Sequence, residues 1–215
     1  MALHHTNRLR ASLRQRRRRT RSLQAASCRV QFCAVTLAAL LALTGATVMG
    51  TQASSSVEYQ VKAAFLLNFA KFIEWPSTVF QSEKTPIAVC VFGYDPFGSA
   101  LDEIIRRQNV NSRELLARRI NELTELKTCQ LVFVGEREEK HLPEILNSVK
   151  ETSALLVGEG EDFAERGGCV QFFIENKRMR FAVNVDAVQR ARLTVSSKLL
   201  ALARIVHDKD HPKGA

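Results

Sequence analysis

Apolar residues recur at three- and four-residue intervals along residues 59–76. The repeated positions are Val61, Phe65, Leu66, Phe69, Phe72 and Ile73. This spacing predicts an amphipathic helix, because residues three and four apart share one helix face. We expect the helix to end at Trp75-Pro76, since the residue before a proline is pushed out of helical geometry.

Shorter apolar runs follow this segment, and helical stretches separate most of them. Buried strands are expected at residues 86–92, 114–120, 130–134 and 153–157. Further helices are expected at residues 99–107, 138–149 and 196–206, with a helical turn at 121–126. Two closing runs, 169–175 and 179–184, have a short polar turn between them and predict an antiparallel hairpin.

The alternation of strands and helices predicts a single compact α/β domain. We expect a mainly parallel sheet with helices on both faces, because parallel strands are joined by helical crossovers that cover the sheet. The C-terminal antiparallel hairpin is expected to form an edge of that sheet. Residues 54–215 contain neither an internal repeat nor a linker rich in proline, glycine or serine, which favours one domain.

The formal net charge of +9 is confined to the beginning of the chain. Residues 1–53 contain nine arginines and no acidic residue, whereas residues 54–215 contain 22 Lys and Arg against 22 Asp and Glu. The body of the chain therefore has no excess of basic residues that would bind phosphate backbones. This charge distribution argues against a nucleic-acid partner.

The first 53 residues have the pattern of a secretory signal peptide. A basic region precedes an apolar run at residues 32–43, and small residues follow it as far as Ala53. We predict cleavage after Ala53 and release of residues 54–215 into the periplasm. The alternative is an uncleaved inner-membrane anchor over residues 30–48, which is just long enough to span a bilayer.

Export changes what the cysteines can do. Cys90, Cys129 and Cys169 remain after the predicted cleavage. In an oxidising compartment two of them can pair, which leaves one over. Their spacing does not match that of zinc or iron–sulfur ligands.

The chain offers few candidates for catalysis. Residues 93–98 carry two glycines at P-loop spacing, but the lysine is missing and Asp95 would repel phosphate, so a turn is favoured. His207 and His211 could form a metal pair, yet their polar surroundings favour a frayed C-terminus. Cys169 has no convincing base partner in the sequence. We predict no enzymatic activity, no cofactor and no metal site.

Several stretches of the body together resemble the YfiR-like family of periplasmic proteins. The most specific is Val61-Lys-Ala-Ala-Phe-Leu-Leu-Asn-Phe-Ala-Lys-Phe-Ile-Glu-Trp-Pro76. The other stretches are residues 92–98, 129–134, 167–173, 180–184 and 193–200. Their order and spacing extend the resemblance from about residue 58 to residue 206.

The resemblance implies a periplasmic regulator that has no activity of its own. Such proteins repress an inner-membrane diguanylate cyclase through its periplasmic part, and an outer-membrane-associated partner or reducing stress relieves the repression. The resemblance also implies a compact α/β domain that forms a homodimer. It implies a disulfide between Cys90 and Cys129, with Cys169 left unpaired because the second disulfide of the family lacks one cysteine here.

Two functional hypotheses follow from these observations. In the first, the domain docks on a membrane-bound signalling enzyme, and Phe65, Phe69, Phe72 and Trp75 on the opening helix contribute the contact surface. An apolar stripe of this kind more often packs into a core. In the alternative, the domain is a periplasmic small-ligand receptor that feeds a sensor kinase or a transporter. Its ligand would bind at the carboxyl ends of the parallel strands, near residues 92–95 and Gly135.

Overall fold

The computed structural model describes residues 49–209. Residues 54–209 form one compact unit. The predicted signal peptide, residues 1–53, lies almost entirely outside the described residues, so its cleavage stays a prediction. Within the described part of the chain, no helix is both long and apolar enough to cross a membrane.

Helix α2, Met49–Phe72, supplies one wall of the core. Its inward face is formed by small and large apolar residues, which are Ala63, Leu66, Phe69 and Ala70. The helix ends at Phe72, slightly earlier than predicted, because the next two residues form strand β1, Ile73–Glu74. Strand β1 pairs antiparallel with β9, Thr194–Val195, and the Ser196 N–H donates to the Phe72 carbonyl.

In the described part of the chain, the main sheet has eight strands in the order β10-β8-β7-β6-β5-β2-β4-β3. The strands are β2 Ile87–Phe92, β3 Asn109–Val110, β4 Arg113–Ile120, β5 Leu131–Val134, β6 Leu155–Gly158, β7 Val170–Glu175, β8 Arg178–Asn184 and β10 Arg204–Val206. Strands β4, β2, β5, β6 and β7 are parallel, and β8 returns antiparallel to β7 as the predicted hairpin. Every residue of β2, β5 and β6 is buried, as expected for central strands covered on both faces.

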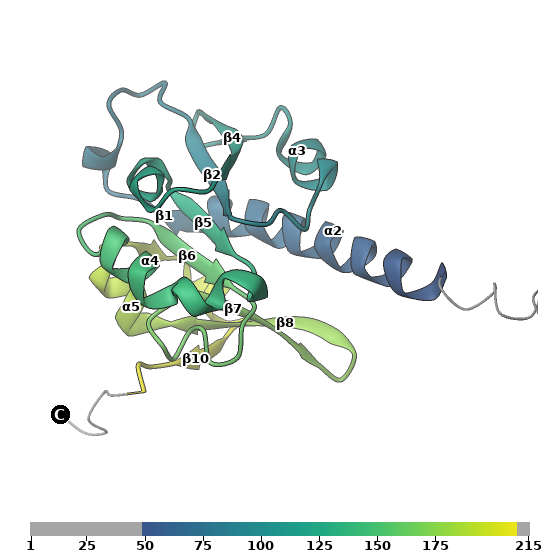
Figure 1. The fold of residues 1–215 in the computed structure, drawn as a ribbon. Helices are drawn as coiled ribbons and strands as arrows, with labels where there is room; N and C mark the ends of the chain where they lie inside the picture. The colour runs from purple at the N-terminus through teal and green to yellow at the C-terminus, as the bar shows by residue number, and fades with distance from the viewer. Residues whose placement is uncertain (1–48, 210–215) are drawn as a thin grey trace, which may run out of the picture. The chain divides into compact units, whose positions relative to one another are not determined.

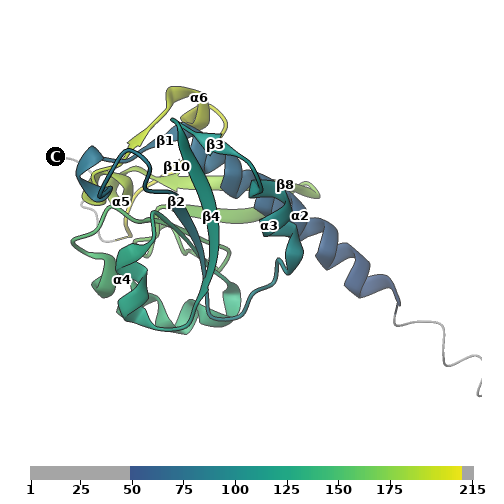
Figure 2. The same ribbon diagram turned by 90° about the horizontal axis from the view of Figure 1, so that it is seen from above.

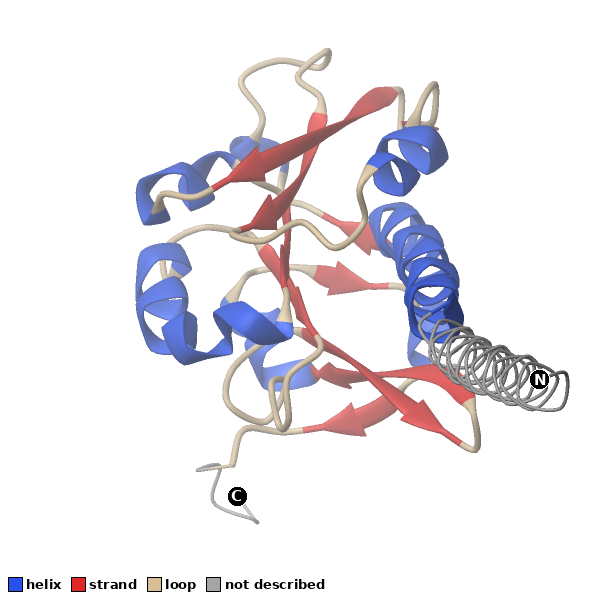
Figure 3. Cartoon of the chain, turned by 45° about the vertical axis from the view of Figure 1, so that its right-hand side comes forward, coloured by secondary structure: helices blue, strands red, loops and turns tan. Residues whose placement is uncertain are grey.

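Helices cover both faces of this sheet, which confirms the predicted fold class. Helices α2 and α3, Ser99–Ile105, lie on one face, as Figures 1 and 3 show. The 3-10 helix η2, Leu123–Thr128, and the helices α4, Leu142–Val149, and α5, Val185–Arg190, lie on the other. A 3-10 turn, η3 Glu136–His141, leads into α4, so the helix expected at 138–149 begins in a different helical geometry.

The C-terminal end of the domain differs from the prediction. The helix expected at 196–206 is limited to the short helix α6, Ser197–Leu200, and the chain then turns into β10. Leu202 points into solvent, so the apolar spacing in this stretch does not produce one buried helix face. Strand β10 lies parallel to β8 and makes the sheet edge that the hairpin was expected to form (Figure 2).

Candidate functional site

A disulfide fastens the central strand β2 to the segment that leads into its neighbour β5. Cys90 and Cys129 are joined with their Cα atoms 6.0 Å apart. Two hydrogen bonds hold this segment beside β2: the Gln130 N–H donates to the Ala88 carbonyl, and the Gln130 side chain accepts from the Ala88 N–H. This is the pairing that the YfiR-like resemblance implied.

The third cysteine, Cys169, is a buried thiol just before β7. Burial raises the pKa of this thiol to about 11. The group therefore stays protonated at neutral pH and is a poor nucleophile, because the thiolate is the reactive form. In the structure, Cys169 lines a cavity between α4 and α5.

The four residues predicted to form a docking surface have different environments. Phe69 is completely buried, whereas Phe65, Phe72 and Trp75 are partly buried and pack against the core. The Trp75 indole N–H also donates to the Gln130 carbonyl at 3.1 Å. Phe69 therefore belongs to the core. Phe65, which is only partly buried, marks the boundary between the buried and the accessible side of α2.

The aromatic rings of α2 pack on the hairpin of β7 and β8. The ring of Phe65 lies 5.8 Å from that of Phe172 and 5.7 Å from that of Phe181. Beyond this cluster, toward the N-terminal end of α2, Val57 and Val61 are exposed. The accessible apolar part of α2 is thus formed by these two valines next to the partly buried Phe65.

A buried polar cluster fastens α2 to the carboxyl ends of β5 and β6. The Lys62 ammonium is almost completely buried and pairs with Glu159, which follows β6, and with Glu58 at 2.6 Å. Glu159 also accepts from the Tyr59 hydroxyl at 3.0 Å and from the Glu136 N–H at 3.2 Å. Burial raises the pKa of Tyr59, and the nearby Glu159 carboxylate raises it further.

This cluster lies on the side of the sheet where the sequence placed a ligand crevice. A cavity of about 360 Å³ adjoins it. The donors of Lys62 and Tyr59 are already taken by Glu159, however, so the groups at this edge serve mainly to hold the helix. The arrangement explains why a lysine is tolerated on the inward face of α2.

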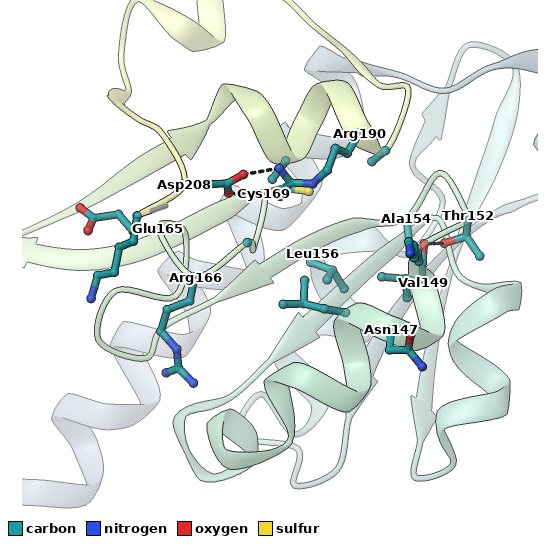
Figure 4. A pocket seen from close by; sticks show the side chains of 16 residues that line it. Asn147, Val149, Thr152, Ala154, Leu156, Glu165, Arg166, Cys169, Arg190 and Asp208 are labelled. Carbon is teal, nitrogen blue, oxygen red and sulfur yellow. Dashed lines mark hydrogen bonds and ion pairs between the residues drawn. The ribbon is translucent and has the colours of Figure 1, made fainter. Parts of the chain in front are cut away.

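A larger cavity of about 750 Å³ lies between α4 and α5, at the opposite ends of β6 and β7 (Figure 4). Its floor is formed by Ala154 and Leu156 of the β6 segment and by Cys169. Side chains from the two helices complete the apolar wall, which are Leu146, Val149, Ala187 and Ala191. Pro143 lies in the first turn of α4, where the missing backbone N–H of a proline costs no helical hydrogen bond.

An ion pair at the rim of this cavity ties the C-terminal segment to α5. The two terminal guanidinium nitrogens of Arg190 both donate to the Asp208 carboxylate, with Nη2 3.1 Å from Oδ1 (Figure 4). The Asn184 amide donates to the same Oδ1 at 2.8 Å. Burial by itself would raise the pKa of Asp208, but the hydrogen bonds from Arg190 and Asn184 outweigh it and lower this pKa below 3.8.

The described part of the C-terminal tail is held against the domain rather than frayed as predicted. The His207 ring contacts the Asp186 carboxylate, with Nδ1 3.1 Å from Oδ2. The Lys209 N–H donates to the Glu165 carbonyl at 2.9 Å. The other half of the suggested histidine metal pair, His211, lies outside the described residues. Among the described residues, no group of three or more His, Cys, Asp or Glu could hold a metal ion.

The sequence model of one family, described as YfiR/HmsC-like, matches residues 59–204. The match includes the C-terminal half of α2 and reaches from there to the first residue of β10. The chain belongs to the YfiR/HmsC-like family. Members of this family are known as periplasmic regulators of diguanylate cyclases.

Two solved structures are similar to this YfiR/HmsC-like domain at 9% sequence identity. One is described as the ABC domain in complex with L-Trp from Streptococcus pneumonia, with a TM-score of 0.42 over 56% of this chain and 56% of that chain. The other is a conserved domain protein from Vibrio cholerae O1 biovar eltor str. N16961, with a TM-score of 0.41 over 55% of this chain and 54% of that chain. This chain therefore spans little more than half the length of either.

Sequence reasoning missed the cavity between α4 and α5 of this YfiR/HmsC-like domain. Arg190 and Asp208 are 18 residues apart, and the contact between them depends on β10, which was predicted as part of a helix. The position of Cys169 directly after two glycines was visible in the sequence, but it gives no indication of a neighbouring cavity. The contacts of the polar C-terminal segment with α5 could not be predicted from the sequence, and these contacts form the rim of the cavity.

Proposed function

We propose that the exported domain represses an inner-membrane diguanylate cyclase by binding the periplasmic part of that enzyme. Membership of the YfiR/HmsC-like family is the observation that carries this proposal, because family members regulate such cyclases from the periplasm. The match extends over most of the folded domain. In this role the chain acts by binding and catalyses no reaction itself.

The accessible part of α2 is the surface that we propose for docking. Val57 and Val61 are exposed on a helix that the Lys62–Glu159 pair and the aromatic cluster hold rigidly. Exposed apolar side chains on a rigid element are suited to the centre of an interface, since little conformational entropy is lost on binding. Phe65, one turn after Val61, borders this surface and packs against the core, whereas Phe72 ends the helix and Trp75 follows strand β1.

Repression requires more than attachment to the cyclase. A partner shifts an equilibrium between active and inactive enzyme only if it binds one of these states more tightly than the other. We therefore propose that α2 contacts the periplasmic part of the cyclase in its inactive arrangement. Relief by an outer-membrane-associated partner would then follow if that partner competed for the repressor.

The test is a deletion of the gene in the native cell, with intracellular cyclic-di-GMP measured before and after. We expect a rise of severalfold that the wild-type chain reverses. Val61→Asp should fail to reverse it, because a carboxylate at the centre of an apolar interface is costly to bury. Leu116→Asp is the matched control, since Leu116 is 48% exposed against 40% for Val61 and lies on β4.

Different outcomes separate the function from the surface. An unchanged cyclic-di-GMP level after deletion, in a strain that makes the protein, would contradict repression itself. Full complementation by Val61→Asp would leave repression standing but would remove α2 as the docking surface. Thermal unfolding of both purified variants shows whether either substitution acts through stability instead.

The cavity between α4 and α5 favours a second candidate function, that of a periplasmic receptor for a small ligand. Its volume of about 750 Å³ and its apolar wall are suited to such a ligand. A ligand could feed a sensor kinase or a transporter through this domain. Stabilisation of the purified protein by a ligand in thermal unfolding tests this alternative, because binding to the folded state raises the unfolding temperature.

A further inference from the structure

We propose that the cavity between α4 and α5 binds a small carboxylic acid with an apolar body, whose carboxylate replaces Asp208 on Arg190. The proposal goes beyond repression of a cyclase and does not depend on it. It rests on the shape and lining of the cavity and on one ion pair at its rim. The ligand is identified here by its chemistry alone.

The apolar body is indicated by the inner wall of the cavity. Leucine, valine and alanine side chains from α4, α5 and β6 line it, and the buried Cys169 thiol lies among them. The pKa of this thiol lies near 11, so the thiol adds no charge to the apolar wall at neutral pH. A volume of about 750 Å³ falls inside the range of roughly 300–1,000 Å³ that is usual for small-molecule sites.

The carboxylate is indicated by the one rim cation whose partner also lines the cavity. Lys150, Arg166, Arg190 and Lys209 are the cations of the lining, and ion pairs between described residues are formed by all of them except Lys150. The pairs are Arg166–Glu139, Lys209–Asp162 and Arg190–Asp208. Glu139 and Asp162 are not part of the cavity lining, whereas Asp208 is. Asp208 therefore already occupies the position in which a ligand carboxylate would meet Arg190.

Exchange of one carboxylate for another leaves the charge at Arg190 unchanged. The Arg190 side chain is 54% exposed, so an incoming carboxylate can approach its guanidinium group from the cavity or from solvent. A guanidinium group binds carboxylates through paired hydrogen bonds, and charge-assisted bonds of this kind are strong. The released Asp208 carboxylate can keep its hydrogen bond from the Asn184 amide, whose length is 2.8 Å.

The exchange would also connect the ligand to the C-terminal segment. Asp208 is held by Arg190 through its side chain and by Asp186 through its backbone N–H, at 3.2 Å. Loss of the contact with Arg190 leaves residues 207–209 attached by fewer bonds. Occupation of the cavity is therefore expected to loosen this segment.

Three compounds with one phenylbutyl body test the proposal: 4-phenylbutyrate, 4-phenylbutanol and 4-phenylbutylamine. Binding to the protein purified from cells that express the full chain is measured by calorimetry at pH 7. We expect 4-phenylbutyrate to bind at least about tenfold more tightly than the other two, because only its head group gains charge-assisted bonds to Arg190. Equal binding of all three, tightest binding of the amine, or no binding of any of them would overturn the proposal.

Substitutions assign the binding to the ion pair. Arg190→Gln should lower the affinity for 4-phenylbutyrate about tenfold, to that for 4-phenylbutanol. Asp208→Asn should raise it severalfold, because the internal competitor is removed. Arg204→Gln is the matched control: Arg204 is 55% exposed, pairs with Glu175 and lies outside the cavity, so its variant should bind like the wild type. An Arg190→Gln variant with wild-type affinity would refute the assignment.

A fourth variant tests whether the ligand binds in the cavity without altering the ion pair between Arg190 and Asp208. Ala191→Phe fills the cavity from the end of α5 without changing any charge. This variant should lose binding of 4-phenylbutyrate while its circular dichroism spectrum remains that of the wild type. Retained affinity in a folded Ala191→Phe protein would place the ligand outside this cavity and overturn the proposal.

Discussion

The two sulfurs of Cys90 and Cys129 lie inside the core, where the disulfide joins the central strand β2 to the entry of β5. The bond closes a loop of 39 residues, and that loop contains α3, β4 and η2. A cross-link of this kind stabilises a fold mainly by restricting the unfolded chain. Its contribution should therefore be visible in unfolding even though the sheet already holds both ends together.

We predict that the double variant Cys90→Ala, Cys129→Ala loses about 2–4 kcal/mol of unfolding free energy. Urea unfolding, followed by the single tryptophan, measures the loss. Cys169→Ala is the matched control, because it removes a buried sulfur without opening a loop, and we expect it to cost only about 1 kcal/mol. Equal losses in the two proteins would mean that the cross-link itself adds nothing.

Residues that act through local spacing were predictable from the sequence, and residues that act through distant pairing were not. The apolar positions of α2 repeat every three or four residues, so the helix and the burial of Leu66 and Phe69 followed from the pattern, whereas Val61 of the same repeat is exposed. The contact of Asp208 with Arg190 depends on where β10 lies, and no local pattern encodes that position. The pairing of Cys90 with Cys129 was suggested by family resemblance, since the spacing of three cysteines left it open.

At the scale of elements, the attachment of α2 depends on a few polar contacts as well as on its apolar face. Glu159 accepts hydrogen bonds from the Tyr59 hydroxyl and the Glu136 N–H, and it pairs with the buried Lys62. One carboxylate thus joins the helix to the ends of two parallel strands. Removal of one partner from such a cluster leaves another charge buried without compensation. The resulting loss of unfolding free energy is larger than the stabilisation that the intact pair provides.

We predict that Glu159→Ala lowers the unfolding free energy by about 2–4 kcal/mol. The loss should be smaller than that for a buried charge without any partner, because the Lys62 ammonium retains its ion pair with Glu58 at 2.6 Å. Glu175→Ala is the control, since it breaks the exposed pair with Arg204 and should cost less than about 1 kcal/mol. If urea unfolding gave equal losses for both variants, the cluster would not be what holds α2.

The elements themselves were predictable where their burial was uniform. Strands β2, β5 and β6 are buried along their whole length, and continuous apolar runs in the sequence predict strands of this kind. The segment 196–206 has helical spacing, but its apolar residues are divided between the core and solvent. Pairing of β10 with β8 overrides the local preference there, and it moves the sheet edge one strand beyond the hairpin.

At the scale of the whole domain, the sheet separates two surfaces. Phe172 and Phe181 face α2, whereas Cys169, before the first residue of β7, faces the cavity between α4 and α5. Figure 3 shows α2 on one side of the sheet and α4 on the other. The proposed docking surface and the proposed ligand site are thus built on opposite faces of one rigid layer, and the central strands between them are fully buried.

This separation predicts that the two proposed activities can be removed independently. Arg190→Gln should bind 4-phenylbutyrate about tenfold more weakly but still return cyclic-di-GMP to the wild-type level in the deletion strain. Val61→Asp should do the opposite, with unchanged affinity for 4-phenylbutyrate and no return of cyclic-di-GMP. Each variant serves as the folding control for the other, because each keeps one function of the same domain.

The outcome also decides whether the two faces communicate. Coupling between sites is reciprocal, so a ligand that weakens docking must itself bind less tightly to the docked domain. If Arg190→Gln failed to restore repression while remaining folded, the independence of the two faces would be wrong. Addition of 4-phenylbutyrate to cells with the wild-type chain would then be expected to change cyclic-di-GMP, and the same addition should have no effect in cells with the cavity-filling Ala191→Phe.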